Sequence, residues 1–175
     1  MGRPFSVAIL TVSDRCSRGE MPDTSGPALA ELVAHELGAV AATACVPDET
    51  DAIRNQLKAW SSSAAAIDLI LTTGGTGLAP RDVTPEATSS VLERRHPGLL
   101  ELARLRCYPG TPRAFLSRGE AGTRGRTLII NLPGSRRGST ECLRALLDVL
   151  PHALEALRGE EQHDDERCAP GGAPA

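Results

Sequence analysis

The stretch IDLILTTGGTGLAPRD, residues 67–82, decides the fold. Its beginning, residues 67–73, is an aliphatic and β-branched run of the kind that forms a buried strand. A glycine-rich loop follows at once, and Thr84-Pro85 then favours the start of a helix. A strand that passes through a glycine loop into a helix predicts one unit of an α/β sheet, with the loop at the strand's carboxyl end.

Strand and helix patterns alternate on both sides of this unit. Further buried strands are predicted at residues 5–12, 39–46 and 127–131, and helices at residues 27–37, 51–60, 84–94, 97–105 and 140–150. We expect Gly38 to end the first helix, Thr50 and Ser139 to cap the second and the last, and Pro151 to break the last before a final turn at Gly159. Residues 108–126 are predicted to be irregular and can reach over a site.

This alternation predicts a single three-layer α/β domain with a mostly parallel sheet and helices on both faces. We expect the domain to span residues 1–159. The remainder, residues 160–175, is charged and then rich in proline, glycine and alanine, and is expected to be a disordered tail.

The composition excludes several classes of protein. Aromatic residues make up only 2% of the chain, so the core must be aliphatic, and a net charge of −3 argues against nucleic-acid binding. The five cysteines include no C-x-x-C pair and the four histidines no H-x-x-x-H pair, which argues against a zinc site and for free thiols in a reducing compartment. No secretory signal or membrane span is predicted, so we expect a cytoplasmic protein.

Three predicted strands end in small or polar residues. These ends are Ser13-Asp14, Thr73-Gly74-Gly75 and the segment from Asn131 to Ser135. Because the carboxyl ends of parallel strands meet at one edge of a sheet, these residues are predicted to line a single cleft.

The glycine loop is suited to hold a phosphate. Glycines allow positive φ and close approach, so that successive N–H groups can converge on an anion. The loop lacks the lysine of a Walker A motif, and Pro80 stands where the dinucleotide fingerprint needs its third glycine. A tight turn without a ligand is the alternative, but the neighbouring threonines and the Arg81-Asp82 pair favour a phosphate loop.

Two carboxylates near the loop are candidate metal ligands. Asp82 follows the loop, and Asp48 follows the predicted strand 39–46. A carboxylate beside a phosphate is repelled unless a cation lies between them, and Mg²⁺ binds one or two carboxylates together with phosphates. Asp82 could instead pair with Arg81 or order the loop, and Asp48 could belong to an ordinary turn.

The other polar residues at this edge allow more than one interpretation. Ser13 and Asp14 could cap a helix or line the cleft, residues 132–135 could be a plain turn, and Glu86 could only complement a helix dipole. Cys16 has no histidine near it in the sequence, so no covalent nucleophile is predicted.

Several segments resemble the MogA/MoaB family of molybdopterin adenylyltransferases, which includes the G domains of gephyrin and its plant counterpart. The likeness runs from about Val7 to Arg158, although the region from Arg106 to Pro112 looks shorter than in relatives. The matching segments are residues 11–15, 46–49, 69–88, 116–118 and 128–135.

The resemblance implies Mg²⁺-dependent transfer of AMP from ATP to the phosphate of molybdopterin, with release of pyrophosphate. It also implies a MogA-like fold, a homotrimer and a downstream molybdenum-insertion protein as a partner. By resemblance, Asp48 and Asp82 are the catalytic and metal-binding residues. The implied substrate contacts are Ser13, Asp14, Thr73, Gly74, Gly75, Thr76, Gly77, Glu86, Ser117, Pro133, Gly134 and Ser135.

A molybdopterin-binding or scaffold module of the same fold, without catalysis, is the alternative function. The presence of both Asp48 and Asp82 favours the enzyme.

Overall fold

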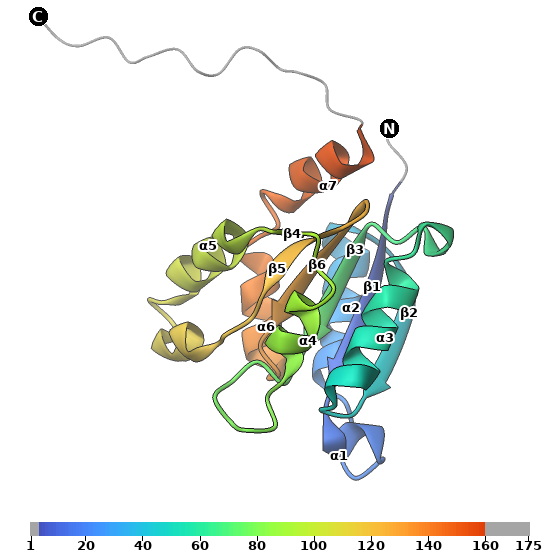
Figure 1. Ribbon diagram of the computed structural model, residues 1–175. Helices are drawn as coiled ribbons and strands as arrows, with labels where there is room; N and C mark the ends of the chain where they lie inside the picture. The colour runs from blue at the N-terminus through green and yellow to red at the C-terminus, as the bar shows by residue number, and fades with distance from the viewer. Residues whose placement is uncertain (1–3, 160–175) are drawn as a thin grey trace, which may run out of the picture.

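The computed structural model describes residues 4–159, which form a six-stranded sheet in the order β2-β1-β3-β6-β5-β4 (Figure 1). Four neighbouring strands are parallel, and the last two continue the sheet in antiparallel pairing. The strands are β1 (Phe5–Val12), β2 (Gly38–Val46), β3 (Leu69–Thr73), β4 (Arg94–Arg95), β5 (Ala121–Arg124) and β6 (Thr127–Leu132). The predicted α/β class with a mostly parallel sheet is confirmed.

Helices cover both faces of the sheet, as predicted (Figure 1). On one face lie α2 (Ser25–Glu36), α5 (Pro97–Cys107), α6 (Arg136–Arg144) and α7 (Leu150–Arg158), and on the other α3 (Thr50–Trp60) and α4 (Thr84–Ser89). The short α1 (Asp14–Ser17) and the 3₁₀ turns η1 (Ser63–Ala65) and η2 (Pro112–Leu116) lie in the connections.

The alternation of side chains along β1 shows why the central strands read as unbroken apolar runs. Val7 and Ile9 pack with α2, whereas Ala8 and Leu10 pack with α3 on the opposite face. Both faces are covered, so most positions along β1 are apolar. Each fully buried Leu or Ile stabilises the fold by roughly 1.5–3 kcal/mol, and the aliphatic core expected from the composition supplies many of them.

The region after α4 differs from the prediction. The helix predicted to reach Arg94 ends at Ser89, because residues 94 and 95 form β4 beside β5. The backbone N–H of Glu93 donates to the carbonyl of Thr123 at 2.8 Å, which ties this segment to the sheet. The stretch 108–126, predicted to be irregular, contains η2 and β5.

Two residues predicted to end or cap helices have other roles. Gly38 is the first residue of β2, and a Cβ atom there would lie 2.3 Å from the carbonyl oxygen of Phe5. This glycine therefore lets β2 approach β1. Thr50 is the first residue of α3, with Glu49 at the N-cap position and no side-chain capping bond.

The last two helices also begin at other residues than predicted. Ser135 caps α6 by accepting a hydrogen bond from the N–H of Gly138 at 3.1 Å, whereas the predicted cap, Ser139, lies buried within the helix. Pro151 lies in the first turn of α7, where its missing N–H costs nothing, and does not break a longer helix. The helix ends as predicted at Gly159, which has a φ of 73°.

Within residues 4–159, no helix is long and apolar enough to cross a membrane. The predicted tail, residues 160–175, lies outside the described residues. The division of the chain at residue 159 and the disorder of the tail therefore stay predictions.

Candidate functional site

The carboxyl ends of the parallel strands meet at one edge of the sheet, as the sequence predicts. The N–H of Ser13, after β1, donates to the carbonyl of Val46 at the end of β2, at 2.9 Å. The hydroxyl of Thr73, at the end of β3, donates to the carbonyl of Pro133 after β6, at 2.8 Å. These bonds bring the predicted site segments together.

The glycines of the loop are required by its close packing. Gly74 and Gly75 have φ values of 104° and 60°, which strongly favour glycine. A Cβ atom on Gly74 would lie 2.2 Å from the carbonyl oxygen of Val12, and one on Gly75 would lie 2.4 Å from the hydroxyl of Thr84. Gly134 is equally confined, because its Cβ would lie 2.9 Å from the Cα of Gly74.

The loop presents free hydrogen-bond donors. Among residues 4–159, the N–H groups of Gly75, Thr76 and Gly77 donate to no protein acceptor. Successive free N–H groups in a loop with a positive φ form the kind of concavity that binds anions. This geometry supports the phosphate-binding interpretation of the loop.

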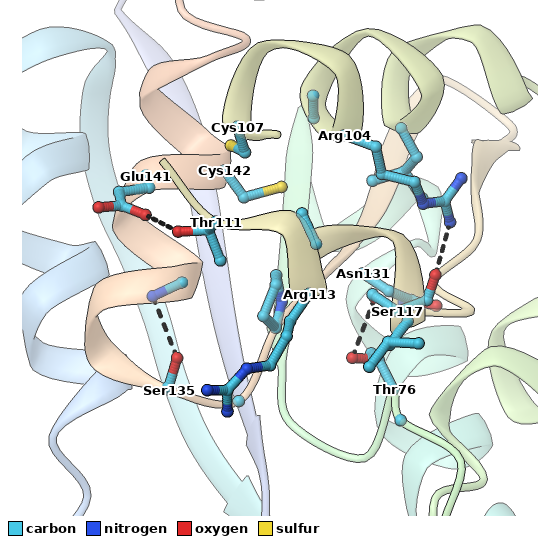
Figure 2. Close-up of a pocket in the computed structure, with 18 of the residues that line it drawn as sticks. Thr76, Arg104, Cys107, Thr111, Arg113, Ser117, Asn131, Ser135, Glu141 and Cys142 are labelled. Carbon is cyan, nitrogen blue, oxygen red and sulfur yellow. Dashed lines mark hydrogen bonds between the residues drawn. The ribbon is translucent and has the colours of Figure 1, made fainter. Parts of the chain in front are cut away.

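Two cavities flank the glycine loop. The larger, of about 390 Å³, lies between the loop, α5, η2 and α6 (Figure 2). The smaller, of about 270 Å³, lies between the loop, the end of β1 and the segment before α2. Gly75, Asp82 and Gly134 line both cavities, so the two meet at the loop.

The predicted site residues divide between these cavities. Those that line only the larger one are Thr76, Gly77, Ser117, Pro133 and Ser135. Those that line only the smaller one are Ser13, Asp48, Thr73 and Gly74. Asp14 and Glu86 line neither, so their contacts with substrate stay predictions.

Asp48 and Asp14 are joined by two hydrogen bonds, each from the backbone N–H of one residue to the carboxylate of the other. The N–H of Asp14 donates to the carboxylate of Asp48 at 2.8 Å, and the N–H of Asp48 donates to the carboxylate of Asp14 at 3.1 Å. Burial raises the pKa of Asp48, and the charges of Asp14 and Asp82 add to this effect. Arg81 pairs with Asp14, at 2.7 Å, and not with Asp82, and its hydrogen bonds lower the pKa of Asp14.

Asp82 both orders the loop and faces the cavities. Its carboxylate accepts a hydrogen bond from the N–H of Ala79 at 2.9 Å, which is the loop-ordering role considered above. A Cβ atom on Gly77 would lie 2.7 Å from the same carboxylate oxygen, so glycine makes room for it.

The carboxylates fit a magnesium ion that is shared with a phosphate. Within residues 4–159, no three His, Cys, Asp or Glu side chains are grouped to hold a metal by themselves. Asp48 and Asp82 line the same cavity, and Mg²⁺ commonly takes one or two carboxylates and completes its shell with phosphate and water.

The serines at the site serve the structure as well as the cavities. Ser13 caps α1 by accepting from the N–H of Cys16 at 3.3 Å. The hydroxyl of Ser117 donates to that of Thr76 at 3.2 Å (Figure 2). The capping role considered for Ser13 is therefore present, and Ser13 still faces the smaller cavity.

Asn131, predicted at a strand end that lines the cleft, does line the larger cavity and also has a structural role that the sequence analysis did not predict. Asn131 is fully buried in β6, and its side chain bonds to Thr72, Thr88 and the N–H of Glu120. A lone amide in an aliphatic strand was the available signal, because a buried polar side chain needs partners. Further walls of the larger cavity come from Arg104, Cys107, Thr111, Arg113, Glu141 and Cys142 (Figure 2).

Comparison with known proteins identifies the family. Residues 8–152 match the family model described as a probable molybdopterin binding domain. The chain belongs to this family. Its MogA/MoaB members include the MoaB protein of Thermus thermophilus, whose crystal structure is 55% identical, covers 89% of this chain and 97% of its own, and superposes with a TM-score of 0.84.

Curated members of the family differ in length. A protein of Helicobacter pylori strain J99 named molybdopterin adenylyltransferase is 38% identical, and the alignment covers 92% of either chain. The Drosophila melanogaster protein named molybdenum cofactor synthesis protein cinnamon is 43% identical over 87% of this chain. The chain spans only 26% of cinnamon, so that relative contains much that has no counterpart here.

Proposed function

We propose that this protein is a molybdopterin adenylyltransferase of molybdenum cofactor biosynthesis, which transfers AMP from ATP to the phosphate of molybdopterin. The observation that carries the proposal is the pair of cavities that meet at Gly75, Asp82 and Gly134. A reaction that joins two substrates needs their reacting groups to meet, and the free N–H of Gly75 lies at that junction, with those of Thr76 and Gly77 on the side of the larger cavity. The H. pylori relative, whose alignment covers 92% of either chain, is named molybdopterin adenylyltransferase.

The chemistry suits a site without a covalent nucleophile. An oxygen of the molybdopterin phosphate forms a bond to the α-phosphorus of ATP, and the bond from that phosphorus to the β-phosphate oxygen breaks and releases pyrophosphate. Alignment of the two substrates and neutralisation of charge can supply the catalysis. We assign these tasks to the glycine loop, residues 73–77, and to the turn at residues 133–135.

Asp48 and Asp82 would hold Mg²⁺ in this site. The ion, when bound, would offset the negative charge of the phosphates. Burial raises the pKa of Asp48, and the charges of Asp14 and Asp82 add to this effect. A cation beside Asp48 would favour its ionised form.

The test is incubation with molybdopterin, ATP and Mg²⁺, followed by measurement of pyrophosphate and of the adenylylated pterin. We expect Asp48→Asn and Asp82→Asn to lose most of the activity, and the same loss when Mg²⁺ is chelated. Asp51→Asn is the matched control, since Asp51 is exposed on α3, lines neither cavity and pairs with Arg54 on the same helix. Binding of molybdopterin without any pyrophosphate release would contradict the proposal and support a binding module.

The homotrimer, the molybdenum-insertion partner and the cytoplasmic location stay predictions. Light scattering after gel filtration tests the first, and we expect a mass of about three times the 18.4 kDa of one chain.

A further inference from the structure

We infer that Arg118 is a positioning residue that fixes the glycine loop, and with it Asp82, at the junction of the two cavities. This inference deepens the proposed function, and the test of it that measures catalysis rests on that function. Arg118 follows Ser117, between η2 and β5, and lines neither cavity.

Arg118 contacts both ends of the exposed part of the loop, residues 77–82. Its backbone N–H donates to the carbonyl of Thr76 at 2.8 Å. Its side chain donates from Nε to the carbonyl of Gly77 at 2.7 Å and from Nη2 to the carbonyl of Asp82 at 2.6 Å. The remaining nitrogen, Nη1, forms an ion pair with Glu86 in the first turn of α4.

The loop between these ends has little support of its own. Residues 78–81 are exposed, and Leu78 exposes 69% of its surface. Within residues 77–82, Ala79 and Asp82 are joined by two hydrogen bonds. Arg81 pairs with Asp14, outside this segment. Removal of Arg118 would therefore leave the carbonyls of Gly77 and Asp82 without their charged donor.

The segment that carries Arg118 is itself firmly held. Arg104 donates to the carbonyls of Ser117 and Gly119, at 3.0 and 3.3 Å (Figure 2 shows the first). The N–H of Glu120 donates to the side chain of buried Asn131 at 3.0 Å. Arg118 thus connects the exposed loop to a segment that is hydrogen-bonded to α5 and β6.

The guanidinium is committed to protein partners, which separates its role from phosphate binding. Each of its three nitrogens has an acceptor, and those acceptors lie in different parts of the loop and on α4. A lysine could pair with Glu86 but presents its donors from one atom, so it cannot replace the planar fork that reaches both carbonyls. The geometry therefore requires arginine.

The catalytic test compares Arg118→Ala and Arg118→Lys with a matched control, Arg106→Ala. Arg106 also donates to a carbonyl and a carboxylate, of Ala145 and Asp148, and its side chain is 41% exposed against 36% for Arg118. We expect kcat for pyrophosphate release to fall on the order of a hundredfold in both Arg118 variants, because small misplacement of reacting groups has effects of that size. Arg106→Ala should keep the wild-type kcat while its thermal midpoint falls about as far as that of Arg118→Ala.

A second measurement does not depend on the proposed reaction. Amide hydrogen exchange should speed up at Ala79 and Asp82 in Arg118→Ala, and should stay unchanged there in Arg106→Ala. If the wild-type protein releases no pyrophosphate, the proposed function fails, but this exchange pattern still tests the positioning role. Unchanged exchange at both amides, or a kcat within threefold of wild type in Arg118→Ala, would overturn the inference.

Discussion

Replacement of Asn131 by alanine is expected to lower the free energy of unfolding by about 3–5 kcal/mol. The Asn131 amide donates to the hydroxyls of Thr72 and Thr88, each at 2.9 Å, and its oxygen accepts from the N–H of Glu120 at 3.0 Å. Three hydrogen bonds at about 1 kcal/mol each account for the lower figure. The partners left unsatisfied in a buried position account for the rest, because Asn131, Thr72 and Thr88 are all fully buried.

Urea unfolding at 25 °C, followed by circular dichroism and by the fluorescence of Trp60, gives this free energy and tests whether the transition is two-state. For a chain of this size the loss corresponds to about 10 °C in the thermal midpoint. Asn55→Ala is the matched control, because Asn55 is the only other asparagine and lies exposed on α3. A loss within about 1 kcal/mol of that control would refute the account of Asn131 as the link between β3, β6 and α4.

Three further outcomes follow from local geometry. Gly75→Ala should reduce pyrophosphate release by at least about a hundredfold, because its Cβ would collide with Thr84 and φ is 60°; activity near wild type would show that the loop adapts. Gly38→Ala should lower the thermal midpoint, since its Cβ would lie 2.3 Å from the Phe5 carbonyl, and an unchanged midpoint would contradict this. Burial raises the pKa of Asp48 in the folded state, so the folded protein binds this proton more tightly and the carboxyl costs stability at neutral pH. Asp48→Asn should accordingly unfold at equal or higher urea than wild type at pH 7, with a difference that shrinks as pH falls through the raised pKa; a difference that grows on acidification would refute the sign.

The sequence predicts the parts of the fold that local pattern determines. Strands β1, β3 and β6 are found where aliphatic runs predict them, because strands covered on both faces are mostly apolar. The convergence of the strand ends follows from parallel pairing alone, which is why residues as far apart as Ser13 and Gly134 could be predicted to share a site.

Other features depend on partners that lie far along the chain. β5 has the sequence AGTR and β4 is Arg94–Arg95, so neither has the composition of a strand. They are strands because β5 pairs with β6 and β4 pairs with β5. Ser135 and Ser139 can both cap a helix, and the choice depends on where β6 ends. The bond from Arg118 to Gly77 spans 41 residues, beyond the reach of any local pattern.

The glycines connect the packing of this edge to its chemistry. A side chain on Gly134 would collide with Gly74, one on Gly74 with the carbonyl of Val12, and one on Gly75 with Thr84 and Asp48. The residues that line both cavities are Gly75, Gly134 and Asp82, so two of the three contribute no side chain where the cavities meet. In the proposed reaction, side chains at Gly75 and Gly134 would keep the two phosphates apart, whereas bare backbone leaves room for them to approach beside the N–H of Gly75. In the proposed reaction we therefore expect the glycine loop to act in two ways, by binding a phosphate through its N–H groups and by leaving space beside it for the second phosphate.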